Sequence, residues 1–259
     1  MTAAIAKIEA GQVLPEWTCV VTPALQRCYH EAAEVPEGLF GDRVDVSVLA
    51  NQCLVATAPL RRGRKAGLHM GHRVLQLEPV GFGETLTVRS RIGEVAPMAT
   101  GTRLRVDLEF VRADGSVPVT AESTSLRPDA RAMRSRGPRP EKVYETEGFA
   151  ELARRRLTPE RVMGYSHEFP DDKVHFDLGV AQSIGFRVPV AQGLMSLTWM
   201  SAAVAADGVP REIDIAAQFR GPIFWDDEIV VLGRAGREFQ VRNAAGKVCS
   251  LGRVARLVR

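Results

Sequence analysis

The chain carries an internal repeat, and this repeat limits the folds that it can adopt. A Thr-Pro pair followed by a tyrosine occurs at 22–29 and again at 158–165. The segment DRVD at 42–45 likewise aligns with DKVH at 172–175. Strand-like segments follow in both halves, beginning with PVGFGETLTV at 79–88 and PIFWDDEIVV at 222–231. Two related segments in one chain favour two copies of one structural unit over a single unrepeated core.

The sequence of each half predicts helices near its start, followed by strands. A threonine directly before a proline is typical of a helix start, because proline fits the first helical turn. The second half also predicts a helix from about Gly193 to Ala206, with one apolar face and a stop at Asp207-Gly208. Segments rich in β-branched or aromatic residues and bounded by turn residues predict antiparallel strands. They are 72–79, 84–95, 102–113 and 117–126 in the first half, and 213–219, 228–235, 238–243 and 247–258 in the second.

The boundary between the halves is predicted at residues 128–147. This segment, PDARAMRSRGPRPEKVYETE, is polar and basic with two prolines in its middle, the composition of a linker or surface crossing. The sequence therefore predicts two related α+β units, at 1–127 and at 148–259.

The overall composition is that of an ordinary globular protein. Of 259 residues, 45% are hydrophobic and 25% are charged, with a formal net charge of +3. So mild a charge does not indicate a nucleic-acid binder. No apolar run reaches the roughly 18 residues that a membrane span requires, and the N-terminus lacks a signal-peptide pattern, so we expect a cytoplasmic protein without membrane contact.

No metal site is expected from the sequence. The four cysteines have no CxxC-like spacing, which argues against a zinc site or a disulfide framework. His69 and His72 could together ligate a metal ion, but no third ligand is suitably spaced along the chain. We therefore expect this segment to be the start of a strand.

The segment 165–195, YSHEFPDDKVHFDLGVAQSIGFRVPVAQGLM, carries the candidate chemistry. It places Asp171, Asp172 and His175 ahead of a short helix, which is followed by the helix that begins at Gly193. An acid, a histidine and a helix N-terminus are the components of an acid/base site with an oxyanion-binding position.

This pattern resembles the hydratase motif of the MaoC-like family, the (R)-specific enoyl-thioester hydratases and 3-hydroxyacyl-thioester dehydratases. The family motif reads roughly as an aromatic residue, S-G-D-x-N-P-I-H, an aspartate and a later A-H-G. The segment V-H-F-D at 174–177 matches I-H-x-D, and Gly193 matches the glycine of A-H-G, with Gln192 in place of the histidine. The run from 169 to 177 is also similar to F-N-x-H-R-I-H-Y-D of the mesaconyl-CoA hydratase-like branch.

The resemblance leaves the catalytic acid open. Pro170 stands where the family keeps its aspartate, but this segment is one residue shorter, and a deletion brings Asp171 into the role. Asp172 would otherwise stand at the asparagine of the motif, and Lys173 at its proline. An aspartate pair before a helix can also be only a cap and a solvated turn.

The resemblance implies a tandem, or double, hotdog fold of the α+β class, with two antiparallel sheets that each wrap a long central helix. It implies a hydro-lyase that interconverts 2-enoyl and 3-hydroxyacyl thioesters of coenzyme A or an acyl carrier protein, without a cofactor, possible as a homodimer. Asp171 and His175 would hold the water, and Gly193 would bind the thioester oxygen. Basic clusters at 61–65 and 154–156 could meet the phosphates of the carrier.

The first half is expected to accommodate the acyl chain and to be catalytically silent. Asp45 stands there in place of the histidine, with no acid/base pair expected nearby. Two alternatives remain at the level of the sequence. The protein could be a hotdog thioesterase, or a non-catalytic acyl-thioester-binding subunit whose site is disabled by Pro170 and Lys173.

Overall fold

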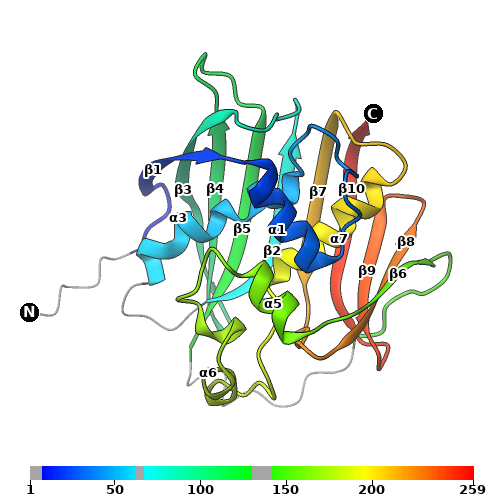
Figure 1. Cartoon of the computed structure of the whole chain (residues 1–259). Helices are drawn as coiled ribbons and strands as arrows, with labels where there is room; N and C mark the ends of the chain where they lie inside the picture. The colour runs from blue at the N-terminus through cyan, green and yellow to red at the C-terminus, as the bar shows by residue number, and fades with distance from the viewer. Residues whose placement is uncertain (1–7, 62–66, 130–141) are drawn as a thin grey trace, which may run out of the picture.

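The computed structural model describes residues 8–61, 67–129 and 142–259. Groups of helices and groups of strands follow one another along the chain (Figure 1). The elements of the first half are β1 Val13–Val20, α1 Pro23–Ala33, α2 Val46–Ala50, α3 Gln52–Arg61, β2 Leu68–Gln76, β3 Thr85–Met98, β4 Gly101–Val111 and β5 Val119–Pro128. Those of the second half are β6 Ala150–Arg156, α5 Pro159–Tyr165, the 3₁₀ turn η1 Lys173–His175, α6 Leu178–Ser183, α7 Gly193–Ala205, β7 Glu212–Phe219, β8 Glu228–Arg234, β9 Glu238–Asn243 and β10 Val248–Val258.

The strands form one continuous ten-stranded antiparallel sheet, in the order β1-β3-β4-β5-β2-β7-β10-β9-β8-β6. Five strands come from each half, and the helices lie together on one face of the sheet (Figure 1). The expectation of two separate sheets is therefore wrong. The physical reason is that β2 and β7 pair with each other, which satisfies two strand edges that would otherwise be unpaired.

The β2–β7 junction is closely packed. Its antiparallel register runs from Gly71 opposite Gln218 to Gln76 opposite Ile213. A Cβ added at Gly71 would lie 2.9 Å from the backbone oxygen of Ala217, so this crossing requires glycine. Arg73 on β2 also reaches across to Asp214 on β7, with Nε–Oδ1 and Nη2–Oδ2 distances of 2.8 and 2.7 Å.

The predicted helix starts are confirmed. Thr22 and Thr158 cap α1 and α5, accepting hydrogen bonds from the backbone N–H groups of Leu25 and Arg161. The long central helix expected in the first half is instead interrupted at Asn51, between α2 and α3. The Asn51 amide donates to the backbone oxygen of Ser47, one turn earlier, and such side-chain hydrogen bonds compete with a regular helix.

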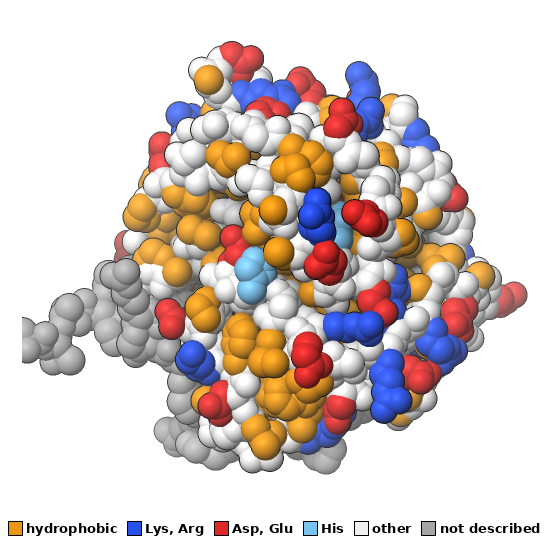
Figure 2. All heavy atoms as spheres, in the orientation of Figure 1, with side chains coloured by type: hydrophobic (Ala, Val, Ile, Leu, Met, Phe, Trp, Pro, Cys, Tyr) orange, Lys and Arg blue, Asp and Glu red, His pale blue; other side chains and the backbone are white. Residues whose placement is uncertain are grey.

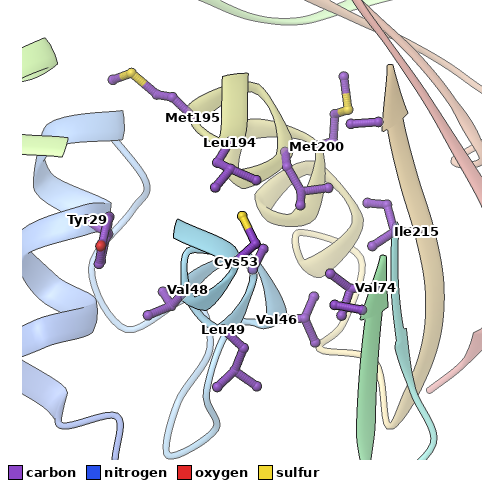
Figure 3. Close-up of a cluster of buried hydrophobic side chains, with 14 of the residues drawn as sticks. Tyr29, Val46, Val48, Leu49, Cys53, Val74, Leu194, Met195, Met200 and Ile215 are labelled. Atoms are coloured by element: carbon purple, nitrogen blue, oxygen red, sulfur yellow. The ribbon is translucent and has the colours of Figure 1, made fainter. Parts of the chain in front are cut away.

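The predicted second-half helix is confirmed as α7, which begins at Gly193. Almost every residue of α7 is buried, and this helix packs against α2 and the sheet (Figure 3). Apolar side chains of α2 and α7 meet Val74 of β2 and Ile215 of β7 in that cluster (Figure 3). The core is thus shared by both halves of the chain.

The outer surface carries charged side chains of both signs between hydrophobic ones, as the helix-covered side shows (Figure 2). None of the helices in the described part of the chain is both long and apolar enough to span a membrane.

The eight predicted strands are all present, but the two outermost strands were not predicted. The segment β1 is interrupted by Pro15, which disfavours an interior strand, and β6 reads AELARRR, which has no β-branched residue. Each pairs with a single neighbour, β3 or β8. Most of the predicted linker, 130–141, lies outside the described residues.

Candidate active site

A cavity of about 390 Å³ lies between the two halves. From the first half, α3, β2, β4 and β5 contribute to its wall, and from the second half the segment 172–196 and the residues after β7. Much of the wall is apolar, including Leu54, Leu104, Phe186 and Ile223. Polar groups are concentrated at His175 and Asp172, at the start of α7, and around His69. A mostly apolar cavity with a few convergent polar groups is the usual form of a small-molecule site.

The imidazole of His175 is held in one orientation. The residue is 8% exposed, and its Nδ1 lies 2.7 Å from the backbone oxygen of Val190. A carbonyl oxygen only accepts hydrogen bonds, so Nδ1 carries the hydrogen in the neutral ring and Nε2 carries the lone pair. His175 therefore presents a basic nitrogen at Nε2.

The carboxylate beside His175 is that of Asp172. Its Oδ2 lies 3.9 Å from His175 Nε2, and its side chain is 20% exposed. The turn η1 causes this proximity, because residues three apart in a 3₁₀ turn lie above one another. Asp171, the acid that the sequence favoured, is exposed and does not line the cavity. Pro170 and Lys173 are likewise exposed and away from the cavity wall.

Gly193 lies in the cavity wall at the first residue of α7. The first backbone N–H groups of a helix have no acceptor within the helix and carry its positive dipole end. A Cβ at this position would lie 2.8 Å from the Phe219 ring, so only glycine fits without movement of that ring.

Gln192 is a site residue that the sequence analysis did not assign. It is 6% exposed, lines the cavity, and its Oε1 has no hydrogen-bond partner among the described residues. A buried acceptor without a donor is unfavourable, so a ligand that donates a hydrogen bond would be stabilised there. The sequence feature that could have identified this residue is that Gln192 stands where the A-H-G motif has its histidine.

The cavity wall also carries Cys53 from α3 and His69 from β2, and the buried His72 lies beside them. His69 Nε2 lies 3.2 Å from the hydroxyl of Ser123. Burial, with a smaller contribution from His69, lowers the pKa of His72 well below its ordinary value, so this imidazole is neutral.

Among the residues that the structure describes, the cationic side chains at the cavity are Arg127 and Arg220. Of the two predicted basic clusters, 61–65 lies outside the described residues apart from the backbone of Arg61, and 154–156 lies on the edge strand β6 and not in the cavity wall. Arg154 is instead paired with Glu151 and Glu228.

The expectation that the first half has no acid/base pair near Asp45 is wrong. Asp45 is fully buried, and its Oδ2 lies 3.0 Å from Nε2 of His30, a residue 15 positions earlier that the motif comparison did not include. Asp45 is also the N-cap of α2, and Asp177 is the N-cap of α6 in the second half. By structural role, Asp45 therefore corresponds to Asp177 and not to His175. Neither His30 nor Asp45 lines the cavity.

No protein-family model and no curated protein sequence matches the chain. Solved structures do match. A crystal structure of HtdX from Mycobacterium tuberculosis is 16% identical, covers 94% of this chain and 98% of its own, and has a TM-score of 0.77. The MaoC-like dehydratase from Phytophthora capsici is also 16% identical, with 95% and 96% covered and a TM-score of 0.70.

A hotdog protein of another activity matches less closely. An acyl-ACP thioesterase from Bacteroides thetaiotaomicron is 12% identical, with 93% and 96% covered and a TM-score of 0.57. The resemblance to MaoC-like proteins predicted from the motif is thus confirmed at the level of the fold. The chain has the hotdog fold that the MaoC-like dehydratases share.

Proposed function

We propose that the protein is a hydratase or dehydratase that interconverts 2-enoyl and 3-hydroxyacyl thioesters. The observation that carries this proposal is that one cavity holds the Asp172–His175 pair together with the glycine N-terminus of α7. Hydration of an enoyl thioester requires both a group that activates water and a donor for the enolate oxygen. The MaoC-like fold of the chain agrees with this chemistry.

The proposed water position lies between Asp172 and His175. Their facing atoms are 3.9 Å apart, too far for a direct hydrogen bond and suited to a shared water molecule. Because Val190 holds the hydrogen on Nδ1, His175 Nε2 accepts a hydrogen bond from the water, and the Asp172 carboxylate accepts the other. Asp172 therefore replaces Asp171 in the role that we assign to the acid.

The reaction proceeds by addition of this water across the double bond. The water oxygen bonds to the β-carbon while one water proton passes to the Asp172–His175 pair, and the π electrons move to form an enolate on the thioester carbonyl. The Gly193 N–H donates a hydrogen bond to that oxygen. The enolate then collapses as the α-carbon takes up the proton, which gives the 3-hydroxyacyl thioester. Dehydration is the reverse sequence.

The cavity suits an acyl chain on an anionic carrier. Its apolar wall is built from both halves, which supports a tandem hotdog arrangement in which the first half makes room for the chain without contributing catalysis. Arg127 and Arg220 in the wall are the cations to which we assign contact with the phosphates of coenzyme A or of an acyl carrier protein. The amide oxygen of Gln192 is a ready acceptor for the substrate hydroxyl.

The reaction class is tested with crotonyl-CoA and a longer 2-enoyl-CoA. We expect loss of the conjugated enoyl-thioester absorbance without release of free thiol. Release of thiol at the same rate would indicate a thioesterase instead. Tight binding of the acyl-CoA, with neither absorbance loss nor thiol release, would refute the hydratase proposal and indicate a binding subunit.

A further inference from the structure

A second group of reactive side chains lies at the cavity, and the proposed hydration does not use it. Cys53 on α3 and His69 and His72 on β2 each present one ligand atom, and these atoms all lie within 4.8 Å of one another. The sequence showed only the histidine pair. The fold supplies the third ligand, because it brings Cys53 on α3 close to both histidines of β2.

His72 gives an independent indication that this group binds something. The residue is 3% exposed, and neither ring nitrogen has a hydrogen-bond partner among the described residues. Burial of a polar group without a partner destabilises the folded protein. An imidazole buried in this state, beside a thiol and a second imidazole, is poorly explained by packing alone and well explained by a role in binding.

We propose that Cys53, His69 and His72 form a binding site for a thiophilic divalent metal ion, with Zn²⁺ as the best match. Structural and catalytic zinc sites use cysteine sulfur and histidine nitrogen at about 2.3 and 2.0–2.1 Å. Ligand atoms around a tetrahedral zinc are then roughly 3.5 Å apart. The three ligand atoms already lie within 4.8 Å of one another, so we expect side-chain rotation to bring them to one ion.

The ligand types select against other common ions. Ca²⁺ and Mg²⁺ prefer oxygen ligands, whereas thiolate and imidazole suit zinc and its neighbours. A ligating histidine commonly forms a hydrogen bond through its other ring nitrogen, and Ser123 lies within reach of His69. Because Cys53 and His69 line the cavity, the fourth coordination position would face the space that the substrate is proposed to enter.

The test measures metal binding by the full chain and does not depend on hydratase activity. The protein is stripped with a chelator, titrated with Zn²⁺ in a calorimeter, and separately loaded with Co²⁺ for absorption spectroscopy. We expect one Zn²⁺ per chain, a higher Tm with zinc, and a thiolate-to-cobalt charge-transfer band. Cys53→Ser should abolish the band, and His72→Leu should weaken zinc binding at least about tenfold.

Two exposed residues provide matched controls. Cys28→Ser and His167→Asn remove the same residue types away from the cavity and should leave zinc stoichiometry and the cobalt band unchanged. Folding of each variant is checked by circular dichroism. If His72→Leu does not fold, the cobalt band of the wild type and its loss in Cys53→Ser still decide the question.

Zinc binding that is substoichiometric, or a cobalt spectrum that Cys53→Ser leaves unchanged, would overturn the proposal. A failure of the hydration assay would not, since metal binding is measured without turnover and the two proposals rest on different residues.

Discussion

Replacement of Asp45 by alanine should destabilise the protein far more than removal of an ordinary helix cap. The carboxylate is fully buried and accepts hydrogen bonds from the Ser47 N–H at 2.9 Å and from the Ser47 and Ser201 hydroxyls at 2.6 Å, beside His30 at 3.0 Å. Loss of the cap alone costs about 1 kcal/mol. The other partners would lose their acceptor inside the core, which raises the total to about 3–5 kcal/mol.

Asp177→Ala is the matched control. Asp177 caps α6 through one hydrogen bond of 2.9 Å to the Val180 N–H, but it is exposed, so its removal should cost only about 1 kcal/mol. Urea unfolding followed by circular dichroism gives both free energies of unfolding. If Asp45→Ala costs no more than Asp177→Ala, the buried network contributes nothing and the reasoning is refuted.

Three further predictions concern packing and reactivity. Gly193→Ala should lower the free energy of unfolding by about 1–3 kcal/mol and impair turnover, because the added Cβ meets the Phe219 ring. Gly221→Ala lies in the same cavity wall, but the atom nearest to its added Cβ is 3.8 Å away. This control should retain both stability and turnover. Thr198→Val removes the hydroxyl that lies 2.7 Å from the buried Tyr165 hydroxyl. This change should lower the free energy of unfolding by about 1–2 kcal/mol, seen as a lower Tm, while Thr198→Ser should leave Tm unchanged. Burial raises the thiol pKa to about 12 at Cys19 and to about 11 at Cys249. Brief alkylation near pH 8 should therefore modify the exposed Cys28 first. Equal labelling of these cysteines by mass spectrometry would contradict this prediction.

The sequence predicted the parts of the fold that depend on local patterns. The helix at Gly193 and the eight interior strands follow from apolar periodicity and turn residues, which act over short stretches of chain. The edge strands were missed because β6 is mostly alanine and charged residues, and it forms only through pairing with β8. The single sheet likewise depends on the pairing of β2 with β7, which no local pattern contains.

The candidate site was predicted by residue type more accurately than by position. The motif led to His175 and Gly193, which both line the cavity. It favoured Asp171 over Asp172, because a shortened motif leaves the register uncertain by one residue, and only the turn η1 decides which carboxylate faces the histidine. Cys53 could not be connected with His69 from spacing, since the two lie on different elements.

The most direct test of the proposed chemistry compares Asp172→Asn with Asp171→Asn in the hydration of crotonyl-CoA. The adjacent aspartates have the same charge and differ in whether they face His175. We predict that Asp172→Asn lowers kcat/KM by about 10²- to 10⁴-fold while Asp171→Asn stays near the wild-type value. Full activity of Asp172→Asn, or a loss confined to Asp171→Asn, would contradict the assignment of the Asp172–His175 pair.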